Sequence, residues 1–267
     1  MNYTFIGDSH SAADDLAVLL QASALQTSRL IFLGDYIDGQ ATRIGTTHHD
    51  SLMPLKVLDM VMARVNDHGD VALLGNHDDF WLQTAAGDSL SYQTWQLNGG
   101  TETWRQLGIP AENLPVVANA LNQPPLARYT QFLAQLPLRW SKGQLLAVHA
   151  GINWDLPLNH QVRDDLMWLR DEYYFNQDKS VHLNTTNQVI VTGHTPVQTI
   201  KDDGYGFIKL QANAADTPRY LIDAGSRSGA SNGGIFALTL SETGAVVAKN
   251  WVINQQLLDG DLPHRHG

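Results

Sequence analysis

The stretch LLGNHDDFW, residues 73–81, joins an apolar strand directly to a group of polar side chains. Its apolar start indicates a buried strand that stops at Gly75. An amide, an imidazole and two carboxylates follow: Asn76, His77, Asp78 and Asp79. Polar groups at the end of a core strand need partners, because burying an unpaired polar group is unfavourable. Those partners are water, neighbouring side chains or a metal ion.

Four other predicted strands end in the same manner. TFIGDSH ends with Asp8 and His10, IFLGDYID with Asp35 and Asp38, LLAVHAG with His149 and VIVTGHT with His194. In α/β sheets, ligands bind beyond the carboxyl ends of the strands, so we expect the five ends to converge. Taken singly, a Gly-Asp pair after a strand usually marks a turn, and one buried histidine is more often a core residue than a ligand. A purely structural interpretation therefore needs five independent coincidences.

The order of the predicted elements indicates an α/β fold. In the first third, strands at 3–8, 29–35 and 70–76 alternate with helices at 11–25 and 51–66, as in parallel βαβ units. Ser11 or Asp14 is the expected cap of the first helix.

The rest of the chain is helical first and then β. Trp-rich helices are expected at 92–108 and 126–140, and strands at 144–151, 188–194, 207–211, 219–225 and 234–240, with a hairpin over 240–253. We expect two packed mixed β-sheets flanked by helices, in a single domain over residues 1–267. Residues 258–267 are expected to form a loose tail.

Composition narrows the function classes. The 267-residue chain carries a net charge of −10, which disfavours nucleic acid as a partner because like charges repel. It contains no cysteine, so a metal would be held by His, Asp, Asn and Glu side chains. No apolar run approaches the length of a membrane span, and the first ten residues lack the pattern of a signal peptide. We expect a cytoplasmic protein without a membrane partner.

The polar residues at the strand ends suit two metal ions better than one. Asp, His, Asp, Asn, His and His supply only oxygen and nitrogen donors, too many for a single tetrahedral ion. Two ions that share one carboxylate would use all six. Such pairs clamp both sides of an in-line displacement, usually on a phosphate ester, and a bridging hydroxide is the natural nucleophile.

The blocks GDSH, GDYID, GNHD, HAG and GHT resemble, in this order, the signature of the calcineurin-like metallophosphoesterases. The resemblance is closer to the phosphoprotein phosphatase branch, with its bacterial Ser/Thr phosphatases and symmetrical diadenosine tetraphosphate hydrolases. It extends from Tyr3 to Leu240 and includes LNGGTETWRQLG and YLIDAGSRSGASNGGIFALTL. It implies a four-layer sandwich of two sheets between helices.

The resemblance also implies a role for each residue. Asp8 and His10 would bind one metal, Asn76, His149 and His194 the other, and Asp35 both. His77 would be the general acid and Asp38 the carboxylate that orients it, whereas Asp78 is expected to be structural. The metal pair implied is Mn first, with Fe, Zn or Ni as alternatives.

Two positions depart from the family pattern. Ser11 replaces a glycine, and Gly39 and Gln40 follow Asp38 where the family has a phosphate-binding arginine. Phosphate recognition favours a guanidinium, so another arginine should compensate. Arg170 is the first candidate, then Arg43, then Arg227. For Arg43 and Arg227 the competing interpretation is a solvated loop charge.

Other polar and aromatic residues have simpler explanations. Asp50 or Ser51 is expected to cap a helix beside His48 and His49, and Asp14, Asp15, Asp164 and Asp165 to be surface or helix-start acids. His264 and His266 lie in the tail. Trp81, Trp95, Trp104, Trp140, Trp154 and Trp168 are expected in the core, although Trp168 could line the site beside Arg170.

Three functions follow from these predictions. The first is a dinuclear metal-dependent phosphoesterase that hydrolyses phosphomonoesters, such as phosphoserine or phosphothreonine in a protein or a small molecule. The second is a dinucleoside polyphosphate hydrolase, which would need more basic groups than a chain with 17 Lys and Arg offers easily. The third is a catalytically silent binding module, suggested by the missing arginine. The physiological substrate and the oligomeric state stay open.

Overall fold

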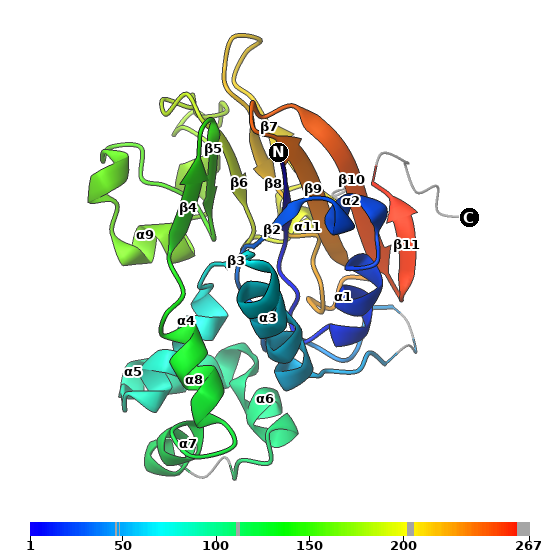
Figure 1. The fold of residues 1–267 in the computed structure, drawn as a ribbon. Coiled ribbons are helices and arrows are strands. Elements are labelled where there is room, and N and C mark those ends of the chain that lie inside the picture. The colour runs from blue at the N-terminus through cyan, green and yellow to red at the C-terminus, as the bar shows by residue number, and fades with distance from the viewer. Residues whose placement is uncertain (46, 48, 111–112, 202–205, 261–267) are drawn as a thin grey trace.

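Two mixed β-sheets lie at the centre of the computed structural model, which describes residues 1–267 except 46, 48, 111–112, 202–205 and 261–267 (Figure 1). The larger sheet has the strand order β11–β10–β9–β1–β2–β3. Its strands are β1 (Asn2–Ile6), β2 (Arg29–Phe32), β3 (Val71–Ala72), β9 (Ile235–Ser241), β10 (Val246–Ile253) and β11 (Gln256–Asp259). β1, β2 and β3 run parallel, and β9, β10 and β11 extend the sheet antiparallel.

The smaller sheet has the strand order β4–β5–β6–β8–β7. Its strands are β4 (Arg139–Lys142), β5 (Leu145–Val148), β6 (Val189–Thr192), β7 (Ile208–Leu210) and β8 (Arg219–Leu221). β5, β6 and β8 run parallel, whereas β4 and β7 pair antiparallel at the edges. Each sheet therefore has three parallel strands whose carboxyl ends meet at one edge.

Successive side chains of each strand point to opposite faces of its sheet, and the apolar ones form three layers. Phe5 of β1 packs between the two sheets with Val191 of β6, whereas its neighbour Ile6 faces the other way, toward Leu16 of α1. Outside the smaller sheet, Ile190 of β6 packs in a third apolar cluster with the helices that cover that face. The four-layer order of helices, sheet, sheet and helices predicted from the sequence is confirmed.

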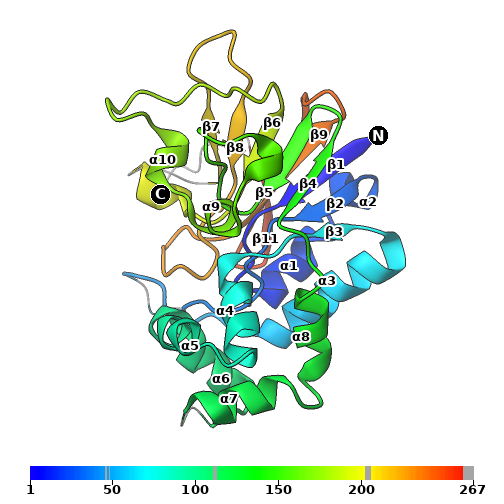
Figure 2. The same ribbon diagram turned by 90° about the vertical axis from the view of Figure 1, so that its left-hand side faces the viewer.

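Short helices cover both outer faces. They are α1 (Ala13–Leu19), α2 (Ser23–Gln26), α3 (Pro54–His68), α4 (Asn76–Ala85), α5 (Ser89–Trp95), α6 (Thr101–Gln106), α7 (Leu114–Leu121), α8 (Ala127–Leu133), α9 (Arg163–Trp168), α10 (Asp171–Tyr174) and α11 (Val197–Ile200), with the single turn η2 (Leu158–His160). Helices α4 to α8 gather at one end of the sheets (Figure 2). None of the helices in the described part of the chain is long and apolar enough to cross a membrane.

Several predicted helices are shorter or divided. The helix expected over 11–25 is two helices, α1 and α2. The helix expected over 92–108 is interrupted by the kinked segment η1 (Gln96–Gly100), where Gly99 has a φ of 106°. The helix expected over 126–140 ends at Leu133, because Pro137 cannot continue it, and β4 follows.

The predicted helix caps are wrong. α1 begins after Ala12 and α3 after Met53, and neither start has a side-chain cap. Pro54 occupies the first turn of α3, where its missing N–H costs nothing.

The strand ends and the tail also differ from expectation. The strand expected over 70–76 is paired only at Val71–Ala72, and α4 begins at Asn76. In the tail, Leu258 and Asp259 belong to β11 and are not loose. Its last seven residues, 261–267, lie outside the described residues.

Candidate active site

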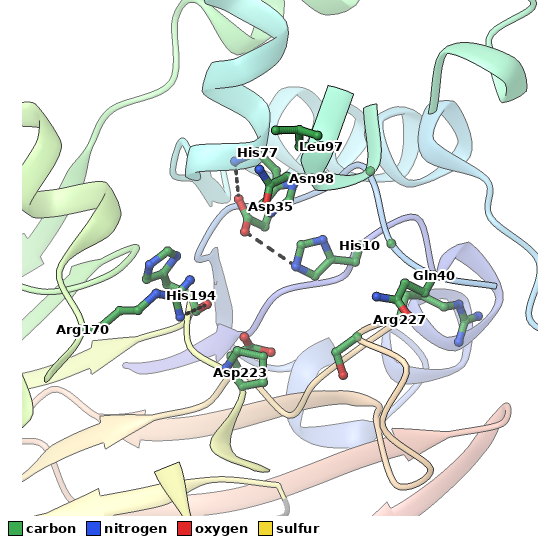
Figure 3. A pocket seen from close by; sticks show the side chains of 14 residues that line it. His10, Asp35, Gln40, His77, Leu97, Asn98, Arg170, His194, Asp223 and Arg227 are labelled. Carbon is green, nitrogen blue, oxygen red and sulfur yellow. Dashed lines mark hydrogen bonds and ion pairs between the residues drawn. The ribbon is translucent and has the colours of Figure 1, made fainter. Parts of the chain in front are cut away.

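A cavity of about 310 Å³ opens where the parallel strands of both sheets end (Figure 3). Six predicted site residues line it: His10, Asp35, His77, Arg170, His194 and Arg227. Asp8, Asn76 and His149 are buried in contact with them. The predicted convergence of the five strand ends is therefore confirmed, because the ends of β1, β2, β3, β5 and β6 all supply residues to one place.

Four side chains form the first group of metal-type donors. The Oδ1 atom of Asn76 lies 2.9 Å from Nε2 of His149 and 2.8 Å from Nδ1 of His194. Oδ2 of Asp35 lies 3.5 Å from the same His149 nitrogen. Donor atoms around one ion with bonds of about 2.1 Å lie roughly 3 Å apart in octahedral coordination, so this spacing fits a single ion.

The hydrogen bonds of His149 show how this group could hold a cation. A carbonyl oxygen can only accept, so the ring donates Nδ1–H to the carbonyl of Leu33 at 2.8 Å. In the neutral ring Nε2 then carries a lone pair and is itself an acceptor. It faces two other acceptors, the side-chain oxygens of Asn76 and Asp35. Only a proton or a metal ion placed between them satisfies all three.

A second group shares Asp35 with the first. Donor atoms of Asp8, His10 and Asp35 lie within 4.8 Å of one another. His10 donates Nδ1–H to the carbonyl of Ile37 at 2.9 Å, which leaves Nε2 3.6 Å from Oδ2 of Asp35. A backbone acceptor thus fixes the ring of His10 as Leu33 fixes that of His149, which is how metal-binding histidines are usually oriented.

Two buried carboxylate oxygens near this second group have no partner among the described residues. They are Oδ1 of Asp8 and Oδ2 of Asp223. Asp223 follows β8 and lines the cavity on the side opposite His77 (Figure 3). The other oxygen of each carboxylate accepts a backbone N–H, from His194 and Gly225 respectively. Buried carboxylate oxygens without a donor are rare, so the two unpartnered oxygens fit a site that takes cations.

Sequence reasoning missed Asp223 although the signal was present. YLIDAG resembles the five recognised strand ends, because an apolar strand is followed by a ligand-type residue and a nearby glycine. β8 is parallel to β6, so its carboxyl end reaches the same edge of the sheet.

The three carboxylates differ in their electrostatics. Burial raises the pKa of Asp8 well above its usual range, and the charges of Asp223 and Asp35 add to the effect. Burial likewise raises the pKa of Asp223. For Asp35, burial acts in the same direction, but His149 and His77 outweigh it and hold its pKa well below the usual range. Asp35 is therefore the carboxylate that stays charged in the metal-free protein.

His77 and Asp38 form a pair beside the two donor groups. Nδ1 of His77 lies 2.6 Å from Oδ2 of Asp38, and the backbone N–H of His77 donates to Oδ1 of Asp35 at 3.0 Å. Burial opposes the positive ring, but Asp35 and the hydrogen bond to Asp38 raise the pKa of His77 to about 9. The imidazole therefore carries a proton at neutral pH in the metal-free protein.

The backbone around the site is strained. His10, Asp35, Asp38 and His194 all have positive φ values, between 41° and 68°. Such conformations are uncommon for residues other than glycine and cluster at functional sites, where the surrounding structure holds them.

Close packing explains two glycines of the signature blocks. A Cβ atom on Gly75 would lie 2.2 Å from Oδ1 of Asp35, and one on Gly193 would lie 2.0 Å from Oδ1 of Asp8. Any larger residue would displace a carboxylate of the site.

Asp78 connects two of the loops. Its carboxylate accepts the backbone N–H groups of Asp35 at 2.8 Å, Tyr36 at 3.0 Å and Gly75 at 3.1 Å. These contacts agree with the structural role expected for it.

A family model for calcineurin-like phosphoesterases matches residues 1–220 of the chain. The chain belongs to this family. It is accordingly a hydrolase that acts on phosphate esters, as the sequence predicts. No sequence among the curated proteins matches it.

Solved structures of this calcineurin-like fold resemble the chain at low identity. One is the crystal structure of "a putative diadenosine tetraphosphatase", with a TM-score of 0.58 and 17% identity over 95% of this chain and 94% of that one. Another is a metallophosphoesterase from Sphaerobacter thermophilus, with a TM-score of 0.51 and 16% identity over 95% and 88%. A protein serine/threonine phosphatase from Saccharomyces cerevisiae, similar to human PP5, has a TM-score of 0.48 and 12% identity over 99% and 81%.

The three candidate arginines of this phosphoesterase lie in different environments. Arg170 lines the cavity next to His194 and donates to Oγ1 of Thr195 at 2.9 Å. Among the described residues no carboxylate pairs with it.

Arg43 and Arg227 are buried, so the interpretation of both as solvated loop charges is wrong. Arg43 binds Asp50 through Nε at 2.7 Å and does not line the cavity. Nη1 of Arg227 lies 3.1 Å from both Asp15 and Asp50. The guanidinium of Arg227 points away from His10 and Asp35 (Figure 3).

The position of the Arg227 side chain also explains why a glycine follows Asp38. Gly39 has a φ of 126°, and a Cβ there would lie 2.6 Å from Cβ of Arg227. The stem of Arg227 therefore occupies the space into which a side chain at position 39 would extend.

The remaining candidates lie elsewhere. Asp15 lies in the first turn of α1, as expected of a helix-start acid, but it is buried and pairs with Arg227. Asp50 also pairs with Arg227 and does not cap α3. Asp14, Asp164 and Asp165 lie in first helical turns as expected. His49 does not line the cavity, and His48, His264 and His266 lie outside the described residues.

Trp81, Trp95 and Trp104 are fully buried, as expected. Trp168 is 40% exposed and contacts His194 with a ring separation of 5.9 Å, but it lines a neighbouring groove.

Proposed function

We propose that this phosphoesterase uses two metal ions to hydrolyse phosphomonoesters, with phosphoserine and phosphothreonine of proteins as the substrate class. One observation carries the proposal: two groups of metal-type donors share Asp35 next to the His77–Asp38 pair. Asp8, His10 and Asp35 would hold one ion, and Asp35, Asn76, His149 and His194 the other. Mn is the first expectation for both.

Each residue then has a task in the reaction. When bound, the two cations would supply positive charge that binds phosphate oxygens and lowers the pKa of a water molecule. Arg170 would orient the phosphate through its guanidinium. His77 would donate its proton to the leaving oxygen, and Asp38 keeps the ring directed by accepting from Nδ1.

The arginines favour a monoester over a dinucleoside polyphosphate. Among the cavity-lining residues only Arg170 and Arg227 are basic apart from histidine, and Arg227 is paired with two buried carboxylates. A chain of several phosphates would meet one unpaired guanidinium in a cavity of about 310 Å³. Diadenosine tetraphosphate is the alternative substrate, since the protein named "a putative diadenosine tetraphosphatase" shares the fold.

Metal content and hydrolysis test the proposal together. We expect about two Mn ions per chain after loading, and hydrolysis of p-nitrophenyl phosphate that a chelator removes and Mn²⁺ restores. Metal without turnover would support the silent binding module, and failure to bind metal under any loading would contradict the proposal. A phosphoserine peptide and diadenosine tetraphosphate, compared at equal concentration, then rank the substrates; cleavage of the dinucleotide alone would reverse our order.

A further inference from the structure

The carboxylate of Asp38 is held by two donors that the mechanism above does not use. We propose that Trp95 and Thr103 are positioning residues, which fix Asp38 and through it the proton-donating ring of His77. The inference rests on the proposed function, in which His77 is the general acid. It assigns a catalytic purpose to the helical segment α5–η1–α6, which otherwise covers one end of the sheets (Figure 2).

Both donors are within hydrogen-bond distance and buried. Nε1 of Trp95 lies 2.8 Å and 3.0 Å from the two oxygens of Asp38, and Oγ1 of Thr103 donates to Oδ1 at 2.5 Å. The side chain of Asp38 is 0% exposed, so water does not compete for it. Together with Nδ1 of His77, three groups converge on one carboxylate.

The chemistry of these groups fixes the proton of His77. An indole N–H can only donate, so Asp38 is an acceptor toward Trp95. With the hydroxyl of Thr103 donating to Oδ1, Oδ2 is left to accept Nδ1–H from His77. The other ring nitrogen, Nε2, is then the one available to a substrate. Removing a donor would leave Asp38 free to turn and would loosen the ring.

The kink in η1 makes both contacts possible. Gly99 has a φ of 106°, and a Cβ there would lie 3.1 Å from Cβ of Asp38. A Cβ on Gly100 would lie 2.7 Å from the carbonyl oxygen of Trp95. Two glycines therefore let the chain turn sharply against Asp38, so that the end of α5 and the middle of α6 face the same carboxylate. Leu97 and Asn98, at the turn, line the cavity itself (Figure 3).

Packing alone does not explain why both donors lie on Asp38. Trp95 packs against Trp81 and Trp104, and that packing needs only the rings. A threonine within a helix commonly bonds a carbonyl of its own preceding turn, but Thr103 reaches across 65 residues of sequence to Asp38.

The dependence of the hydrolysis rate on the leaving group distinguishes a positioning role from a purely structural one. An ester with a good leaving group needs little help from a general acid. The test uses Mn²⁺-loaded protein with p-nitrophenyl phosphate and phenyl phosphate, the poorer leaving group. We expect Thr103→Val to lower kcat on phenyl phosphate about tenfold or more and to change p-nitrophenyl phosphate hydrolysis little. Thr103→Ser should restore the rate. Thr101→Val, on the exposed side of the same helix, is the control.

An NMR measurement on metal-free protein makes the test independent of turnover. The Nδ1 proton of His77, held by a carboxylate, should give a downfield resonance that is absent from His77→Asn. We expect Thr103→Val to shift or broaden it and Thr101→Val to leave it unchanged.

Equal rates for Thr103→Val and wild type, or equal losses on both esters, would overturn the positioning role and leave the proposed function intact. If wild type cleaves neither ester, the proposed function fails, and an unperturbed resonance in Thr103→Val would then overturn the positioning role as well.

Discussion

At the scale of single residues, a substitution of His77 tests the proposed acid–base step separately from metal binding. Its ring faces the cavity but supplies no atom to either donor group. We expect His77→Asn to keep about two metal ions and to lose kcat about 10²- to 10⁴-fold on phenyl phosphate, the usual contribution of general acid catalysis. Elemental analysis and steady-state kinetics on one preparation measure both. Unchanged kcat would show that His77 is not the acid.

We expect phosphate binding to depend on Arg170. It has no carboxylate partner among the described residues and lies beside His194. We expect Arg170→Lys to lower kcat/KM about tenfold to a hundredfold, chiefly through KM, because lysine cannot form the bidentate contact. Arg43→Lys, away from the cavity, is the matched substitution. A larger effect from Arg43 on KM would reverse the ranking of the two arginines.

Substitution of Asp223 tests whether a carboxylate outside the two donor groups affects their affinity for metal. Burial raises its pKa above the unfolded value, so its ionisation disfavours folding increasingly as pH rises through the folded pKa. We therefore expect Asp223→Asn to stabilise the metal-free protein at neutral pH and to weaken Mn²⁺ binding about tenfold or more. Urea unfolding and calorimetric titration check the two effects. Tighter metal binding by the variant would exclude this role.

At the scale of elements, the sequence predicted the strand ends better than the helices. A strand that ends in a glycine and a ligand-type residue is a local pattern, and parallel pairing carries all such ends to one edge. The predicted helices are too long, because the apolar pattern of the sequence continues where the helices do not. The backbone is kinked at Gly99, and the helix before Pro137 has already ended. The contact of Trp95 with Asp38 spans 57 residues, and no local pattern indicates it.

Gly99 offers a test of the kinked element itself. An alanine there would meet Asp38 and adopt an unfavourable positive φ, so we expect Gly99→Ala to destabilise the fold by about 1–2 kcal/mol and to slow phenyl phosphate hydrolysis. Gly87 has a φ of 89° but no atoms near its Cβ position. Gly87→Ala should therefore cost similar stability without affecting turnover. Equal loss of activity in both variants would mean that general destabilisation, and not Asp38, limits the rate.

At the scale of the whole molecule, the site lies where two separately built sheets meet. Composition and periodicity predicted two sheets and their covering helices. They did not predict that Arg43 and Arg227 would be buried, because each guanidinium has a partner that is distant in sequence. Arg43 donates to the carbonyl of Gly233, and Arg227 pairs with Asp15. The candidate active site therefore has buried carboxylates and few basic groups, and we expect its stability to depend on pH and on metal.

Two buried groups give the metal-free protein a defined pH dependence. The pKa of His77 is raised to about 9, and burial and Asp35 raise that of Asp78 to about 8. Both folded values exceed the unfolded ones, so their contribution to stability is present at low pH and is lost as pH rises through the folded values. Each group loses about two pH units of this linkage between pH 6 and pH 9, so we expect the free energy of unfolding to fall by about 5 kcal/mol over that range. His77→Asn should make the free energy of unfolding depend less steeply on pH.

Metal binding should oppose that loss, because the donor atoms bind a cation only when they carry no proton. Bound Mn²⁺ stabilises the folded state by RT ln(1 + [L]/Kd), about 4 kcal/mol per site at a thousandfold excess over Kd. The gain in melting temperature on adding Mn²⁺ should therefore be larger near pH 9 than near pH 6. Asn76→Ala, which removes one shared acceptor of His149 and His194, should reduce the gain at both values. A gain that falls with rising pH would mean that the cation binds outside these two groups.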